Sequence, residues 1–327
     1  MLFLTETIQF LEEVISHSLS YFVNTEKRIN IIYLFSSLVL AFYVYKKSNL
    51  KESFWRYIFN KKVWLGKSAI IDYMLFLLNG FFKILLIGPY VIFGFYIAFY
   101  VNESLLQFFG FPSNSLSVPV TLILYTITLT VVNDFFSFLI HYMMHKIPVL
   151  WEFHKTHHSA TTLNPLTQYR IHPVELVINN VRSIIIFGLI TGIFDYLSSH
   201  QIDKVLFLGA NIFTFLFFFL GANLRHSHVK LRYPRIIEYV FISPFQHQIH
   251  HSTKKEHFNK NMGSKFAIWD YFFGTLVFSD KISRINFGIP KENFNYTSFS
   301  GNLLNPFLKI FNRISKYFSL SNNNLKH

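Results

Sequence analysis

The sequence predicts an all-α integral membrane protein whose histidines gather at the membrane surface. Three observations support this. Of 327 residues, 51% are hydrophobic and only 14% are charged, whereas an average soluble domain has about 25% charged residues. Several apolar stretches approach or exceed the roughly 20 residues needed to cross a bilayer as a helix. Thirteen of the 15 histidines lie between His141 and His257, and several share the spacing of a helix face.

Four hydrophobic stretches are candidates for membrane spans. Ile29–Tyr45 is the first. Ala69–Val101 is the second and is longer than one crossing needs. Its glycines and Pro89 favour a tilted span with a re-entrant piece, or a tight hairpin, and we expect one net crossing. Leu116–Ile140 is the third, and the fourth is a helical hairpin that joins Leu176–Tyr196 to Val205–Ala222.

The charge pattern orients these spans. Lys and Arg number 30 against 17 Asp and Glu, a net charge of +13. Because the basic residues flank apolar spans, we expect an anionic membrane surface as the partner, and no nucleic acid. Lys46–Lys67 is basic and should stay cytosolic, while Asn102–Ser117 has no Lys or Arg and should face the other side. The third span then returns to the cytosol at His141.

The chain divides into three predicted regions. Residues 1–115 form an N-terminal membrane region with the first spans, residues 116–280 a catalytic domain, and residues 281–327 a basic tail. In that tail, Leu303–Phe318 has apolar residues at three- to four-residue spacing. This pattern fits a helix in the membrane interface or a helix packed on the body of the protein.

Three short histidine motifs carry the chemistry. They read His141-Tyr-Met-Met-His145, His154-Lys-Thr-His157-His158 and His247-Gln-Ile-His250-His251. Residues at i, i+3 and i+4 share one helix face, so each motif can present two or three imidazoles in one direction. Because they fall at predicted cytosolic span ends, we expect them to converge at the membrane surface.

Metal ions explain such a cluster best. Buried imidazoles need partners, and neutral imidazole is a common metal ligand. Eight or more ligands exceed what one ion needs, so two ions are expected. Imidazole suits iron, zinc, copper and nickel, and the residue type alone leaves the metal open. The chain has no cysteine, which excludes disulfides and cysteine-bound zinc or iron–sulfur centres.

These motifs resemble the fatty acid hydroxylase/sterol desaturase superfamily of membrane di-metal oxygenases. The resemblance covers roughly Leu116–Val277. Besides the three boxes in order, it rests on the phrases Trp151–Ser159, Arg170–Glu175, Gln246–Ser252, Asn261–Gly263 and Ile268–Thr275. It implies a small bundle of membrane helices under a cytosolic histidine-rich cap. It also implies a non-haem centre of two iron ions that activates O₂ and hydroxylates or desaturates a lipid.

The resemblance also implies a ligand set and supporting residues. The ligands would be His141, His145, His154, His157, His158, His226, His247, His250 and His251. Because the free ring nitrogens of metal-bound histidines need hydrogen-bond partners, we expect such partners, or further ligands, to include His228, His172, His257, Asp134, Asp270 and Glu175, with Glu152 as another carboxylate candidate. His172 precedes Pro173 and has an equally simple structural explanation.

The predicted function is therefore O₂-dependent hydroxylation of a lipid C–H bond, on a sterol, fatty acyl or related lipid. A desaturase would use the same centre. From a different class, a zinc-dependent membrane hydrolase or a metal-binding transporter remains an alternative. The sequence contains no recognisable electron-transfer domain. Electrons would thus come from a separate protein of the ferredoxin or cytochrome b5 type.

Overall fold

The computed structural model describes residues 2–199, 206–207, 210–289 and 296–324, and these residues are mostly helical. The helices are α1 (Leu2–Ser20), α2 (Ile31–Lys47), α3 (Phe54–Ile58), α4 (Lys61–Trp64), α5 (Lys67–Phe82), α6 (Ile92–Phe109), α7 (Val118–Lys146), α8 (Pro148–His158), α9 (Pro173–Ser198), α10 (Ile212–Phe219), α11 (Arg235–Glu238), α12 (Pro244–His250), α13 (Ile268–Phe272) and α14 (Phe299–Asn324). Shorter helical turns are η1 (Lys83–Ile87), η2 (Gly88–Tyr90), η3 (Pro165–Tyr169), η4 (Ala222–His226) and η5 (Lys255–His257). One small antiparallel hairpin pairs β1 (Leu206–Phe207) with β2 (Ala210–Asn211).

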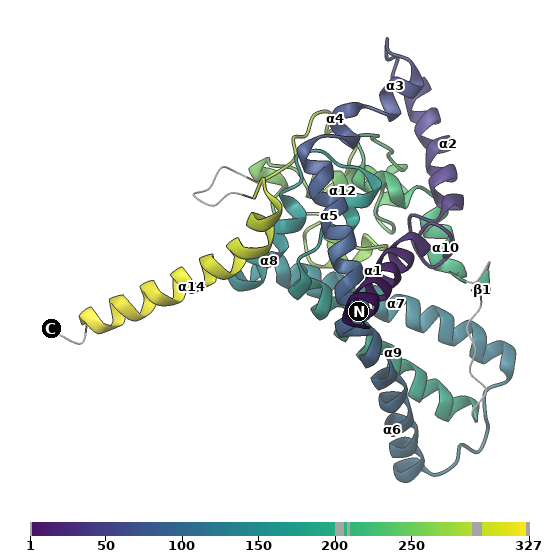
Figure 1. Cartoon of the computed structure of the whole chain (residues 1–327). Coiled ribbons are helices and arrows are strands. Elements are labelled where there is room, and N and C mark those ends of the chain that lie inside the picture. The colour runs from purple at the N-terminus through teal and green to yellow at the C-terminus, as the bar shows by residue number, and fades with distance from the viewer. Residues whose placement is uncertain (1, 200–205, 208–209, 290–295, 325–327) are drawn as a thin grey trace.

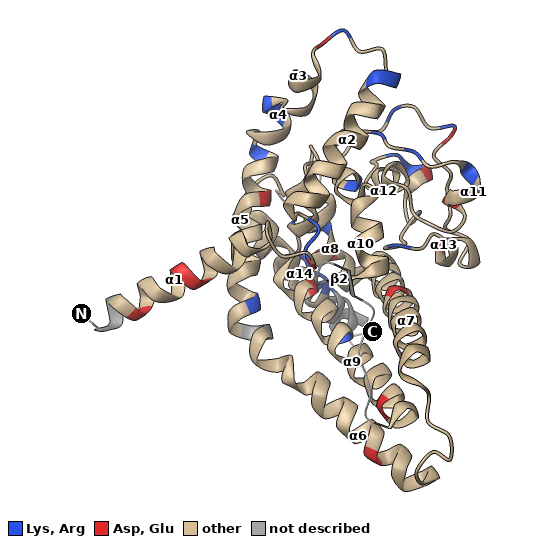
Figure 2. Ribbon diagram, turned by 90° about the vertical axis from the view of Figure 1, so that its right-hand side faces the viewer, with Lys and Arg blue, Asp and Glu red and all other residues tan. Residues whose placement is uncertain are grey.

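Four helical segments are long and apolar enough to cross a membrane. They are Lys67–Leu85, Gly88–Phe109, Val118–Lys146 and Pro173–Ser198. α6, α7 and α9 extend together away from the remaining helices, and Figure 2 shows them almost free of Lys and Arg. The prediction of an all-α membrane protein with a histidine-rich site is therefore confirmed.

The packing of α6 against α9 depends on small residues. Gly94 and Ala98 of α6 face Gly188 and Gly192 of α9, and a Cβ on Gly192 would lie only 2.4 Å from the Ala98 carbonyl oxygen. Small residues at four-residue spacing let two helix backbones approach closely, which favours helix association within a membrane. These two helices therefore pack tightly against each other.

The long stretch Ala69–Val101 is divided by a break in the helix. α5 passes through the π-helical turn η1 and the short η2 before α6 begins. Gly88 and Pro89 lie in this break, and proline cannot donate the backbone hydrogen bond of a regular helix. The chain does not turn back on itself between α5 and α6 (Figure 1), so the tight-hairpin alternative is wrong.

Two of the predicted spans differ in the structure. Ile29–Tyr45 forms α2, a helix of 17 residues that is not among the four candidate spans. The Ser36 hydroxyl on α2 donates to the carbonyl of Phe219, which ties α2 to α10. The predicted arm Val205–Ala222 is not one long helix, because the Asn211 side chain caps the start of the eight-residue α10. The turn expected around Ser198–Asp203 lies partly outside the described residues.

The structure shows the C-terminal α14 packed on the body of the protein over its first turns, and the membrane-interface alternative stays a prediction. Its first turns pack on α8, where the Thr156 hydroxyl donates to the Asn302 carbonyl at 2.9 Å and Phe153 contacts the ring of Phe307. Further along, the helix leaves the body of the protein (Figure 1), and Phe311 and Ile314 are exposed.

Candidate metal centre

Four elements bring the histidines together at one end of the candidate membrane spans. His141 and His145 lie at the end of α7, and the second motif occupies the last turns of α8. His226 ends η4, and the third motif occupies α12 and its C-cap. All nine residues assigned as ligands from the resemblance are brought together.

The short helices have well-defined starts. α8 begins with Pro148, and α12 begins with Pro244, a residue type favoured in the first helical turn. Ser243 also forms a capping box with Gln246: the Ser243 side chain accepts from the Gln246 N–H, and the Gln246 side chain accepts from the Ser243 N–H. These starts fix which residues share a helix face, and so fix where the histidines point.

The nine histidines form two groups. The five-histidine group contains His141, His145, His154, His158 and His250. The four-histidine group contains His157, His226, His247 and His251. Within each group, one ligand atom from every residue lies within 4.8 Å of the others.

Both HxxHH motifs are split between the groups. In α8, His154 and His158 enter the five-histidine group while His157 enters the other. In α12 the arrangement is reversed, since His247 and His251 enter the four-histidine group and His250 crosses over. The i, i+4 pair of each helix thus serves one group and the i+3 residue serves the neighbouring group. This interleaving places the two groups side by side.

The spacing of the ring nitrogens fits metal coordination. The Nε2 atoms of His141 and His154 are 3.1 Å apart, and the Nε2 atoms of His226 and His247 are also 3.1 Å apart. Two nitrogens bound at about 2.0–2.1 Å to one ion lie roughly 2.9–3.4 Å apart. In the five-histidine group, the Nε2 atoms of His145, His158 and His250 are buried without a protein partner. The donor set therefore fits two transition-metal ions.

Hydrogen bonds fix several ring tautomers. Nδ1–H of His154 donates to the Glu175 carboxylate at 3.0 Å, and Nδ1–H of His141 donates to the Met262 carbonyl at 2.7 Å. His157 and His250 donate in the same way to the carbonyls of Arg170 and Lys260. With its proton on Nδ1, each neutral ring turns the Nε2 lone pair into its group, as metal ligands require.

His247 is the exception among these rings. The guanidinium of Arg225 donates to its Nδ1 at 2.8 Å, so a neutral His247 carries its proton on Nε2. That nitrogen lies 3.2 Å from Nε2 of His251. A metal ion bound here would take the place of the proton between these rings.

The histidines outside the candidate membrane spans are held neutral by burial. Desolvation lowers the pKa of His154 and of His157 to about 3. It also lowers the pKa values of His226 and His251 well below the usual value, with nearby histidines adding to the effect. At neutral pH these imidazoles are unprotonated, which is the form that binds metal.

The predicted supporting carboxylates act at different places. Glu175 contacts a ring directly, through His154. Asp270 instead accepts from the backbone N–H groups of Met262 and Gly263, and so holds the loop whose carbonyl binds His141. Asp134 accepts from the backbone N–H groups of Lys265 and Phe266 and from the Trp269 indole.

Glu152 and three predicted histidines lie outside both groups. Glu152 pairs with Lys155 and Arg313. His228 bonds the carbonyl of Tyr57, and His172 caps α9 through the N–H of Val174. His257 is buried in η5.

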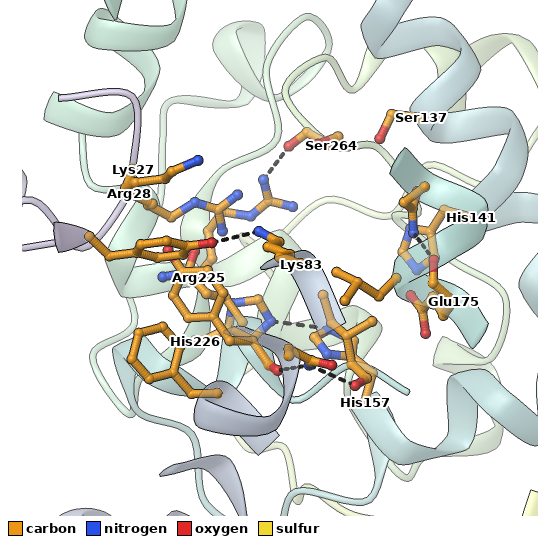
Figure 3. A pocket seen from close by; sticks show the side chains of 18 of the residues that line it. Lys27, Arg28, Lys83, Ser137, His141, His157, Glu175, Arg225, His226 and Ser264 are labelled. Atoms are coloured by element: carbon orange, nitrogen blue, oxygen red, sulfur yellow. Dashed lines mark hydrogen bonds between the residues drawn. The ribbon is translucent and has the colours of Figure 1, made fainter. Parts of the chain in front are cut away.

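A cavity of about 360 Å³ reaches both histidine groups. Figure 3 shows His141, His157 and His226 along it, together with the basic residues Lys27, Arg28, Lys83 and Arg225. The sequence reasoning did not assign these basic residues. Lys83 could have been found from the sequence, because an ionisable residue inside an apolar stretch indicates a functional role.

A second cavity, of about 320 Å³, also reaches the five-histidine group but is lined by a different set of residues. Its lining includes Trp151, His145, His158 and His250. The five-histidine group is thus reached by two separate cavities.

Comparison with known proteins agrees with this site. Residues 126–275 match the fatty acid hydroxylase family model. The ornithine lipid hydroxylase OlsE of Rhizobium tropici is 28% identical over 159 residues, which cover 49% of this chain and 44% of that protein. The alkylglycerol monooxygenase of Caenorhabditis elegans is 30% identical over 143 residues, or 44% of this chain and 25% of that protein.

A second alkylglycerol monooxygenase, from Xenopus tropicalis, is 25% identical over 145 residues, 44% of this chain and 28% of that protein. The matched region spans less than half the length of each of these relatives. No solved structure matches the chain. Residues 126–275, which carry all nine clustered histidines, are thus the part of the chain that is similar to the fatty acid hydroxylase family, in agreement with the resemblance read from the sequence.

Proposed function

We propose that this protein is a membrane-bound oxidoreductase that hydroxylates a C–H bond of a lipid with O₂. The observation that carries the proposal is the pair of interleaved histidine groups beside a cavity bounded by α5, α7 and α9. The named relatives, a lipid hydroxylase and two alkylglycerol monooxygenases, support the same reaction class.

In this proposal the nine histidines hold two non-haem iron ions, one in each group. Bound iron would supply the activation of O₂ that C–H hydroxylation needs. The all-imidazole donor set suits iron but also other transition metals, so the residue types do not identify the metal. The similarity to the fatty acid hydroxylase family supports iron.

The chain's own residues bind and orient around that centre. Glu175 and the carbonyls of Met262, Arg170 and Lys260 hold the ring protons away from the metals and fix the imidazole planes. Apolar side chains such as Phe76, Ile140 and Phe218 line the cavity and can pack against a lipid chain. Seven of the nine histidines are buried, which limits the access of bulk water to the metals they would hold.

We propose that the catalytic unit comprises residues 116–280, with residues 1–115 as a membrane region and residues 281–327 as the tail. The membrane region also contributes to the site, since Lys27, Arg28 and Lys83 line the cavity. The histidine-rich cap would face the cytosol of a multi-pass protein. Supporting this orientation, the basic α3–α4 segment lies on the cap side, opposite the end of α6 (Figure 1).

Electrons would come from a separate ferredoxin-type or cytochrome b5-type protein. Such donors carry acidic surfaces, which suit the basic residues on the cap side (Figure 2). The location of the histidines also weighs against transport, since a transporter would hold its ligands near the middle of its spans. Here His141 and His145 lie at the cap end of α7.

The test is turnover with labelled oxygen. Iron-loaded protein in detergent is incubated with a membrane lipid extract, ¹⁸O₂ and a reduced ferredoxin or cytochrome b5, and lipids are analysed by mass spectrometry. A hydroxylase adds one ¹⁸O atom to a lipid in a reductant-dependent way. A lipid that loses two hydrogens without gaining ¹⁸O would establish the desaturase alternative instead. No change in any lipid, with folded iron-loaded protein, would contradict the proposed function.

A further inference from the structure

Four basic side chains form one wall of the cavity that reaches the histidines. We call Lys27, Arg28, Lys83 and Arg225 the basic wall. They come from three separate elements: the segment between α1 and α2, the turn η1, and η4. Figure 3 shows them on the side of the cavity away from His141 and Glu175. Positively charged residues from distant parts of the sequence therefore line the same side of the cavity.

Arg225 already has protein partners. Its guanidinium donates to the carbonyls of Gly263 and Ser264 and to His247. It holds the four-histidine group in position, and its charge also reaches the cavity. The other three members of the wall are less completely paired.

Arg28 lacks a carboxylate partner among the residues that the structure describes. Its guanidinium carbon lies 5.7 Å from the centre of the Phe218 ring, and its Nε is buried without a hydrogen bond. Burial lowers the pKa of Arg28. A half-buried guanidinium without a carboxylate partner carries a desolvation cost, and an anion bound in the cavity would offset it.

Two lysines converge on a single aromatic ring beside Arg28. The ammonium of Lys83 donates to the Tyr21 hydroxyl at 2.7 Å and lies 5.1 Å from the centre of the Tyr21 ring. The ammonium of Lys27 lies 5.0 Å from the same centre. Both ammonium groups therefore place positive charge beside Tyr21, where an anion in the cavity could interact with either of them.

The acidic residues of the cavity do not remove this charge. Two carboxylates line it, Glu26 and Glu175, and Glu175 accepts the proton of His154. The basic wall has four positive groups, so the lining keeps an excess of positive charge. Arginine and lysine together bind phosphate or carboxylate oxygens well, the guanidinium in a bidentate way.

We propose that the basic wall binds the anionic oxygen group of the lipid substrate, a phosphate or carboxylate of its headgroup. This inference rests on the proposed lipid oxidation. At about 360 Å³ the cavity is near the lower end of the usual range for ligand pockets, about 300–1,000 Å³. It can hold a headgroup and the adjoining atoms but not a whole two-chain lipid. The oxidised carbon would thus lie only a few bonds from the charged group.

The test measures binding without turnover. Purified protein in dodecyl maltoside is titrated with dioctanoylphosphatidylglycerol, with dioctanoylglycerol as the uncharged probe and inorganic phosphate as the free anion. We expect the anionic lipid to bind at least about tenfold more tightly than the uncharged lipid. Arg28→Gln should remove most of this preference, Arg28→Lys should keep part of it, and binding of dioctanoylglycerol should not change.

Lys61→Gln is the matched control, because Lys61 is an exposed lysine on α4. It should leave all three titrations unchanged, and thermal unfolding should verify that each variant is folded. If Arg28→Gln fails to fold, Lys27→Gln replaces it. Equal affinity for charged and uncharged lipid in the wild-type protein would overturn the inference, as would inorganic phosphate binding as tightly as the anionic lipid. Because no oxidation is measured, these results are independent of the ¹⁸O₂ experiment.

Discussion

Replacing His157 or His250 by alanine is expected to abolish lipid oxidation. His250 belongs to the five-histidine group and His157 to the four-histidine group, so each change removes a nitrogen from a different proposed metal ion. Loss of groups that only support metal ligands typically costs about 10–100-fold, and loss of a ligand should cost more than about 100-fold. The measurement is the rate of ¹⁸O incorporation into lipid, with metal content measured on the same sample.

His228→Ala is the matched control for these two variants. His228 is mostly buried and bonds the Tyr57 carbonyl at 2.8 Å, but it lies outside both histidine groups. Its replacement should lower stability somewhat while turnover per folded molecule and metal content persist. Wild-type turnover in both His157→Ala and His250→Ala would rule out the ligand assignment. Equal loss in all three variants would indicate a structural effect.

Replacing Asp72 by alanine is expected to destabilise the fold strongly. The Asp72 carboxylate pairs with the Arg170 guanidinium at 3.1 Å, and the two side chains are 0% and 1% exposed. Removing one partner leaves a buried charge without compensation, which costs about 3–5 kcal/mol. Because the Arg170 carbonyl accepts from His157, the change should also disturb the four-histidine group. The measurement is the free energy of unfolding, or the thermal midpoint in detergent.

The chain provides a surface pair for comparison. The Arg235 guanidinium and the Asp280 carboxylate lie 3.0 Å apart, a similar distance, but their side chains are 54% and 45% exposed. Asp280→Ala should therefore cost only about 0–1 kcal/mol. If Asp72→Ala cost no more than Asp280→Ala, the buried pair would not have the structural role assigned to it.

Much of the site could be predicted from local spacing alone. The i, i+3 and i+4 pattern of His154, His157 and His158 required only a helix to bring three imidazoles onto one face. The pattern could not tell which of them serves which group, because that depends on how α8 and α12 face each other. The direct partners of the rings were also hidden, since most are backbone carbonyls such as those of Met262 and Lys260. Every residue has a backbone carbonyl, so the sequence does not show which carbonyl accepts a hydrogen bond from a histidine.

The wrong prediction for Val205–Ala222 has a related cause. Hydrophobicity alone made Val205–Ala222 resemble a membrane arm, whereas Asn211 caps a short helix within it. In α2, Ser36 and Ser37 are buried against protein while Phe35 is exposed, so one face of the helix contacts the rest of the chain. Mean hydropathy could not reveal these tertiary contacts.

The central claim is that two irons lie in the two histidine groups, and metal content tests it most directly. Protein expressed in iron-supplied cells, purified under anaerobic conditions and measured by inductively coupled plasma mass spectrometry should contain about two iron atoms per chain. His157→Ala and His250→Ala should each contain fewer, and His228→Ala should match the wild type. A folded wild-type protein that holds no metal, even after incubation with ferrous iron, would contradict the account.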